Sequence, residues 1–192
     1  ANEFPKSRYM TNGQVKCPLV VRTGNGAGSR FGAQHSQSVE NWCMMIPGLK
    51  VVAPSTPRDV IGLMAAAVRD PDPVIFFEHK ALYRRVRGEA PGAGHRTPIG
   101  RAAVVRPGTE ATIVTYGAMV WVALEAADRL AEEGASVEVI DLRTLLPLDR
   151  DPAHVAQDVQ LGYLGVEDAL GRYGVTLDTQ GKVDVDATVA AR

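Results

Sequence analysis

The residue best suited to chemistry in this sequence is His35, which follows a glycine-rich stretch, residues 24–32. An apolar run at 18–23 precedes the glycines and is typical of a buried strand. An imidazole titrates near neutral pH, so it can bind a substrate or move a proton under ordinary conditions. A histidine in this position can equally be a helix cap or a packed surface residue, and the spacing alone leaves both interpretations open.

The glycine-rich stretch does not carry a known nucleotide-binding pattern. Gly24, Gly26, Gly28 and Gly32 do not fit G-x-G-x-x-G, and the Walker lysine with its serine or threonine is absent. Glycines at these positions would allow a ligand or a partner chain to approach the backbone closely. A merely flexible loop is the simpler alternative.

A basic cluster follows the third predicted strand. Lys80, Arg84, Arg85 and Arg87 stand at the start of a segment, 80–102, that is interrupted by proline and glycine. Such a segment is typical of an interdomain linker. The cluster either binds a phosphate or an acidic partner, or is the solvated face of the linker.

The pattern of apolar runs predicts an α/β protein. Apolar runs without alternation favour parallel sheets that are covered on both faces. Ser55 or Thr56 with Pro57 and Asp59 forms a strong helix start. We expect helices at 33–47, 55–69, 118–133 and from Asp151–Pro152 onward, and strands at 18–23, 49–53, 74–77, 111–116, 137–142 and 161–166, with an edge strand at 183–187.

Composition excludes several classes of protein. The 192 residues carry a net charge of −1, so nothing favours binding to nucleic acid or to a membrane surface. No apolar run reaches the roughly 18 residues of a membrane span. Cys17 and Cys43 are predicted to be thiols in a reducing compartment. The start lacks both an initiator methionine and a signal peptide, which suggests a fragment.

Four segments, in order along the chain, together resemble one family. They are similar to the β subunits of thiamine-diphosphate-dependent 2-oxo acid dehydrogenases, which act on pyruvate, branched-chain 2-oxo acids or acetoin, within the transketolase superfamily. A transketolase or deoxyxylulose-phosphate synthase relative fits these segments less well. The segments are GAQHSQS (32–38), PGLKVVAPSTP (47–57), DPVIFFEHK (72–80) and VIDLRTLLPLD (139–149).

The resemblance implies a domain organisation of two parallel-sheet α/β units. Residues 1–79 correspond to the second half of a pyrimidine-binding domain. Residues 80–102 form the basic linker, and residues 103–192 correspond to part of a transketolase C-terminal domain. The glutamate that activates the aminopyrimidine of the cofactor is expected upstream of this chain, so no cofactor-binding residue is assigned.

The resemblance also implies roles for particular residues. His35 matches the active-site histidine, which helps in substrate binding and in acyl transfer to lipoamide. A structural potassium ion is implied at the positions of Leu19, Ala67, Val68, Asp70 and Asp72, partly through backbone carbonyls. For the two aspartates, turn chemistry beside two prolines is the alternative.

The implied function is that of an enzyme subunit. It would decarboxylate a 2-oxo acid, pyruvate before the others, with thiamine diphosphate and magnesium held mainly by an α partner. Two α and two β chains and a lipoyl acyltransferase core are the implied partners. The expected compartment is the bacterial cytoplasm, or the mitochondrial matrix in a eukaryote. An inactive, truncated remnant that serves only as an interaction module is the alternative.

Overall fold

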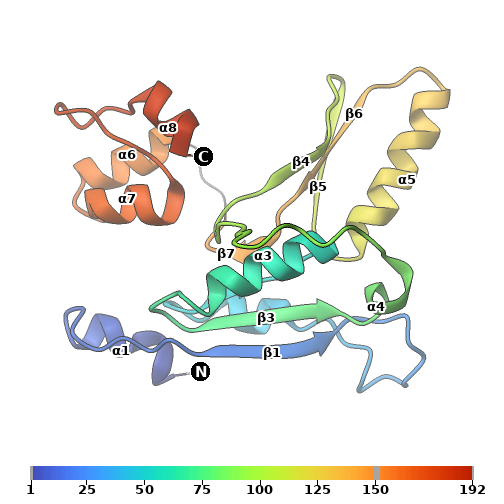
Figure 1. The fold of residues 1–192 in the computed structure, drawn as a ribbon, viewed down its shortest axis with the longest axis horizontal. Helices are drawn as coiled ribbons and strands as arrows, with labels where there is room; N and C mark the ends of the chain where they lie inside the picture. The colour runs from blue at the N-terminus through green and yellow to red at the C-terminus, as the bar shows by residue number, and fades with distance from the viewer. Residues whose placement is uncertain (1, 149–151, 192) are drawn as a thin grey trace. The chain divides into compact units, whose positions relative to one another are not determined.

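A computed structural model describes residues 2–148 and 152–191. The chain divides into two compact units, residues 1–147 and 148–192, which we treat separately. The first unit contains both β-sheets (Figure 1). The predicted boundaries near residues 80 and 102 fall inside this unit, and the division at those points remains a prediction.

The first sheet has the strand order β1-β3-β2-β7. Its first three strands run parallel, as expected of an α/β protein, while β7 is antiparallel to β2. The carboxyl ends of the parallel strands therefore share one edge of the sheet. The strands are β1 Val20–Asn25, β3 Val74–His79, β2 Lys50–Val52 and β7 Thr144–Leu146.

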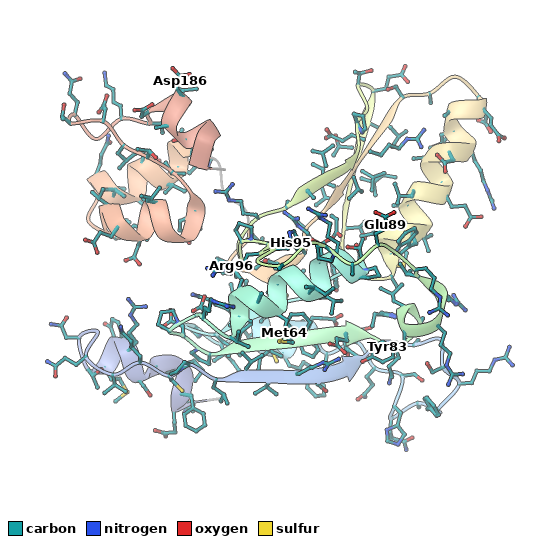
Figure 2. The ribbon with its side chains drawn as sticks, viewed as in Figure 1. Met64, Tyr83, Glu89, His95, Arg96 and Asp186 are labelled. Atoms are coloured by element: carbon teal, nitrogen blue, oxygen red, sulfur yellow. The ribbon has the colours of Figure 1, made fainter. Side chains whose placement is uncertain are left out.

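Two helices cover the faces of the first sheet. Helix α3, Pro57–Ala67, packs Leu63 and Ala67 on one face, against Phe76 and its neighbours. Met64 of the same helix also contacts this core (Figure 2). The short helix α2, Glu40–Met44, covers the opposite face. The predicted start of α3 is confirmed, because the Thr56 hydroxyl accepts a hydrogen bond of 3.1 Å from the Asp59 N–H.

The prediction that the first strand is covered on both faces is wrong. Strand β1 lies at the edge of its sheet and pairs with β3 alone among the described residues. Val21 in its middle is 43% exposed. Its apolar run therefore does not mark a fully buried strand in this structure.

The second sheet has the order β4-β6-β5, with helix α5 packed on it. Strand β5 is parallel to β6, and β4 is antiparallel to it. Ala123 and Ala127 of α5 meet Val137 and Val139 of β6 in a small core. Sequence analysis predicted three of these four elements and missed β4. Their bounds are β4 Ala103–Arg106, β5 Ala111–Thr115, α5 Met119–Glu132 and β6 Val137–Asp141.

The second unit is helical. Helices α6 Pro152–Gln160 and α7 Val166–Tyr173 pack around a core of Val155, Ala169 and Val175, and helix α8, Val185–Ala191, follows. The predicted strand at 161–166 is wrong, and of the predicted edge strand at 183–187 only Val183 pairs, in an isolated antiparallel bridge with Leu177. The Tyr163 N–H closes a turn on the Asp158 carbonyl (2.9 Å), and the Asp184 carboxylate accepts from the Ala187 N–H (3.0 Å) where α8 begins. The predicted cap Asp151 lies outside the described residues.

The remaining features of the described chain are minor. Short helices occupy Phe4–Met10 (α1) and Leu82–Arg85 (α4), the latter inside the predicted linker. Cys17 and Cys43 are both free and partly buried. Within the described residues, no helix has the length and apolar character needed to cross a membrane.

Candidate active site

His35 lies on an exposed turn, five residues before α2, and not at a helix start as predicted. The helix begins only at Glu40. The Ser36 N–H closes a turn on the carbonyl of Ala33 (3.3 Å), and the preceding Gly32 has a φ of +77°. The chain reaches helical geometry only after this turn, and His35 is left accessible at the carboxyl edge of the first sheet.

Residues from two strand ends hold the turn in place. Asn25, at the end of β1, is 3% exposed, and its side-chain carbonyl accepts a hydrogen bond of 3.3 Å from the Val39 N–H. The Gly26 N–H donates to the Gln37 carbonyl (2.9 Å). The ammonium of Lys80, which follows β3, donates to the backbone carbonyl of His35. These bonds fix the backbone that carries the imidazole and leave the imidazole itself open to a ligand.

His79, the last residue of β3, packs against the glycine-rich stretch at residues 24–32, which we call the glycine loop. Gly26 has a φ of +79°, and a Cβ at this position would overlap the His79 ring. The Nδ1 atom of His79 accepts a hydrogen bond of 3.3 Å from the Ala81 N–H, which assigns the proton of the neutral ring to Nε2. Burial lowers the pKa of His79, and the nearby Glu40 carboxylate only partly opposes this effect.

The buried carboxylate of Glu78, near the end of β3, has two hydrogen-bonding partners. Glu78 is 4% exposed and accepts from Arg22 Nε (2.5 Å) and Nη2 (3.1 Å). Tyr83, in α4 (Figure 2), donates its hydroxyl hydrogen to the same carboxylate at 2.7 Å. Burial first, and then this hydrogen bond, raise the pKa of Tyr83 to about 12. The cluster forms part of the wall of a hollow of about 290 Å³ beside α4.

A second hollow, of about 230 Å³, also has His79 in its wall. The same wall includes Asn25, the buried Glu40 and Tyr116. Burial raises the pKa of Tyr116, and the Glu40 carboxylate raises it further. Sequence analysis did not name Asn25, Glu40 or His79 as site residues. Polar residues at the carboxyl ends of predicted parallel strands were the available signal for Asn25 and His79.

A buried polar pair joins the segment before α3 to the second sheet. The carboxylate of Asp141, which is 0% exposed, accepts from the Ser55 hydroxyl and from the Arg143 N–H (3.0 Å). The Trp121 indole donates to the Ser55 carbonyl (3.0 Å). Burial raises the pKa of Asp141, and the Ser55 hydroxyl bond works against this shift.

The predicted potassium positions gather around the turn after α3. Asp70 pairs with Lys50 at 2.6 Å, and Asp72 pairs with Arg8 (3.2 Å) and Lys50 (3.4 Å). The Asp72 N–H also donates to Asp70 Oδ1 (2.9 Å), which is the turn chemistry named as the alternative. Within the described residues, no group of three or more His, Cys, Asp or Glu side chains is arranged to hold a metal.

Backbone oxygens of the same turn do suit a hard cation. The Leu19 and Ala67 carbonyls accept from Val74 and Asp70 N–H groups, at 2.8 and 3.2 Å, and each retains a second lone pair. The Val68 carbonyl accepts no hydrogen bond from the described backbone. A cation here would therefore be held by carbonyl oxygens, because the aspartate carboxylates are already paired.

The two sets of predicted residues lie at opposite ends of the first sheet. Leu19 and Asp72 precede β1 and β3, whereas Asn25 and His79 end these strands, and the strands are parallel. His35 belongs with the carboxyl ends through its bond from Lys80. The proposed ion would thus support the sheet and would not touch the site.

Two known protein domains match the chain. Residues 3–86 match the pyrimidine binding domain of transketolase, and residues 100–176 match the transketolase C-terminal domain. The chain is built from transketolase-type pyrimidine-binding and C-terminal domains. The resemblance that the four sequence segments predicted is confirmed, since the similar curated proteins are 2-oxo acid dehydrogenase β subunits and an acetoin oxidoreductase β subunit.

Three relatives illustrate the similarity. The chain is 51% identical over 78% of its length to the 2-oxoisovalerate dehydrogenase subunit beta of Bacillus subtilis. It is 47% identical over 95% to the beta subunit of acetoin:2,6-dichlorophenolindophenol oxidoreductase of Cupriavidus necator, and 45% identical over 91% to a mitochondrial pyruvate dehydrogenase E1 beta subunit of Arabidopsis thaliana. It spans about half of each relative, namely 46%, 54% and 49%.

Solved structures show the same fold. An inactive β4 tetramer of a split-gene transketolase matches with a TM-score of 0.57 and 27% identity, over 76% of this chain and 45% of that one. The transketolase of Campylobacter jejuni matches with a TM-score of 0.55 at 15% identity, over 75% of this chain and 24% of that one, which bears on the fold alone.

Proposed function

We propose that the chain is part of the β subunit of a thiamine-diphosphate-dependent 2-oxo acid dehydrogenase. The observation that carries the proposal is His35, held at the carboxyl edge of the first sheet by Lys80 and by the turn that Asn25 and Gly26 anchor. Its backbone is fixed while its imidazole is exposed, as binding to a substrate requires.

The chain's own residues would orient the substrate, and the cofactor would supply the carbanion chemistry when it is bound. His35 would hydrogen-bond the substrate and assist acyl transfer to a lipoyl group. Within the described residues, no group of three or more His, Cys, Asp or Glu side chains could hold magnesium, so we assign the magnesium diphosphate to an α partner. We also propose an assembly of two α and two β chains with a lipoyl acyltransferase core, as the resemblance to 2-oxo acid dehydrogenase β subunits implies. The proposed compartment is the bacterial cytoplasm or, in a eukaryote, the mitochondrial matrix.

Pyruvate is the first proposed substrate, with branched-chain 2-oxo acids and acetoin as alternatives. The relatives are named for all three activities, with identities between 45% and 51%. A substrate panel on the complete protein, assembled with its α partner, decides among them. We also propose the potassium site of Leu19, Ala67, Val68, Asp70 and Asp72.

The decisive experiment is His35→Ala in the complete assembled enzyme. We expect turnover to fall by about 10²-fold or more, the usual scale for a positioned acid–base group. The melting temperature should be retained, because an exposed imidazole buries little surface, and thiamine diphosphate affinity should change little. The exposed His154 in α6 provides a control, as His154→Ala should leave turnover unchanged. Near wild-type turnover in a stable His35→Ala enzyme would reject the catalytic role.

An interaction module without activity is the second candidate. It predicts that the complete protein binds its partner chain yet shows no thiamine-diphosphate-dependent turnover with any member of the substrate panel. In that case His35→Ala would change neither assembly nor the absent activity.

A further inference from the structure

A third hollow, of about 430 Å³, lies between the glycine loop and the residues that follow β3. Its walls come from two segments, 28–31 and 80–85. The segments are in close contact, because a Cβ on Gly28 would come within 2.9 Å of the Ala81 Cβ. The two segments therefore pack against each other, and the hollow between them is distinct from the hollow of Glu40 and Tyr116.

Four cationic side chains line this hollow: Arg30, Lys80, Arg84 and Arg85. None of the four pairs with a carboxylate among the residues that the structure describes. Tyr83, also in the wall, donates to Glu78, but that carboxylate is already paired with Arg22. The hollow thus concentrates positive charge that the described chain does not neutralise.

The backbone of the glycine loop adds donors. The sign of φ alternates along it, positive at Gly28 (+99°), Arg30 (+57°) and Gly32 (+77°) and negative at the residues between them. Successive N–H groups in such alternating conformations turn toward one side and form a concavity that suits an anion. The N–H groups of Ser29 and Arg30 have no hydrogen-bond partner in the described part of the chain.

We propose that this hollow binds a small phosphate-bearing molecule. Guanidinium groups match phosphate oxygens in paired hydrogen bonds, and a lysine ammonium adds a point charge. A volume of about 430 Å³ lies in the range of small-molecule sites. The solvated linker face that the sequence left open predicts side chains that point apart, whereas these four line one cavity.

The hollow is connected to His35. Lys80 lines it and also donates to the backbone carbonyl of His35. An anion that draws the ammonium toward itself would weaken this bond and shift the turn. Phosphate binding should therefore change the environment of the His35 imidazole. The proposal does not depend on the proposed enzymatic activity.

The test uses inorganic phosphate and the complete assembled protein. Calorimetric titration with phosphate, against chloride at matched ionic strength, should show saturable binding. The double variant Arg84→Gln/Arg85→Gln should weaken it at least tenfold, because it removes two charge-assisted hydrogen-bonding groups from the hollow. The matched control is Arg87→Gln/Arg96→Gln, which removes the same charge outside the hollow and should retain the affinity. Arg96 lies well apart from Tyr83 (Figure 2).

A second readout follows the imidazole of His35 by NMR. Phosphate should shift its signal in the wild type and in the control, and not in the Arg84/Arg85 variant. Equal weakening in both double variants would show a general charge effect and overturn the proposal. Absence of saturable phosphate binding would overturn it as well. Tighter binding of oligoglutamate than of phosphate would also overturn the proposal, and would indicate an acidic protein partner. None of these outcomes depends on turnover, so the proposed enzymatic function can fail or hold separately.

Discussion

His79 is a neutral imidazole between the glycine loop and Glu40, and its pKa is lowered mainly by burial. The unfolded chain takes up a proton at His79 near pH 6.5, before the folded chain does. The free energy of unfolding should therefore be at its full value above about pH 6.5 and fall as the pH drops through and below that point.

Urea titrations at several pH values between about 5 and 7.5 measure this effect. In His79→Gln the part of the pH dependence due to His79 should disappear, so the variant's curve should be flatter than that of the wild type. His154→Gln, on an exposed position of α6, should keep the slope of the wild type. Equal slopes in wild type and His79→Gln would contradict the assignment.

The second prediction for a single residue concerns Asp141. Its buried carboxylate satisfies the Ser55 hydroxyl and the Arg143 N–H. Asp141→Ala leaves both donors without a partner, so we expect the free energy of unfolding to fall by about 3 kcal/mol. Asp141→Asn keeps an acceptor and should lose less. Glu133→Ala, on an exposed site after α5, is the control. Chemical denaturation compares the three, and an alanine variant as stable as the control would refute the role.

At the scale of elements, sequence reasoning succeeded where the signals are local. Thr56, Pro57 and Asp59 carry the start of α3 within four residues, and the structure uses them as predicted. The helix expected at 33–47 is present only as α2, Glu40–Met44, and its start was misplaced because it follows a long-range bond, from the Val39 N–H to Asn25. Strand β7 was missed for a similar reason, since its three residues form a strand only by pairing with β2.

A further prediction concerns the stability of a variant in the glycine loop. Gly26 combines a φ of +79° with direct contact to the His79 ring, so Gly26→Ala must strain the backbone and displace the ring. We expect the free energy of unfolding to fall by about 2–3 kcal/mol. Gly92 has open space around it and no positive φ, and Gly92→Ala should leave stability unchanged or slightly raised. Chemical denaturation measures the free energy of unfolding of both variants, and equal values would contradict the predicted strain at Gly26.

At the scale of the whole chain, the sequence singled out His35 but named neither the strand-end residues beside it nor the contacts around the predicted cation positions. Parallel strands bring their carboxyl ends together, so the placement of His35 near Asn25 and His79 follows from the strand pattern. The pairing of Asp70 with Lys50 and of Asp72 with Arg8 joins residues 20 and 64 positions apart. No local pattern encodes such contacts, and they change how a cation could be held at this turn.

The last prediction concerns that cation. If the ion is held by the backbone carbonyls around Leu19 and Val68, potassium should raise the melting temperature of the complete assembled protein above its value in sodium. A ligand that binds only the folded state, at about 100 times its dissociation constant, adds about 2.7 kcal/mol. Thermal melts in the two chlorides at matched ionic strength measure the difference, and identical curves would remove the site.

Asp70→Asn separates carbonyl from carboxylate ligation. The carboxylate pairs with Lys50 at 2.6 Å in a partly buried position, so the variant should melt at a lower temperature in both salts. With carbonyl ligands, the difference between potassium and sodium should persist in this variant, because the substitution leaves every backbone oxygen of the turn in place. With a carboxylate ligand, the difference should vanish, since the charge that holds the ion is gone. Loss of the potassium effect in Asp70→Asn, with the effect intact in the wild type, would therefore reject the carbonyl site and assign the ion to the aspartate side chain.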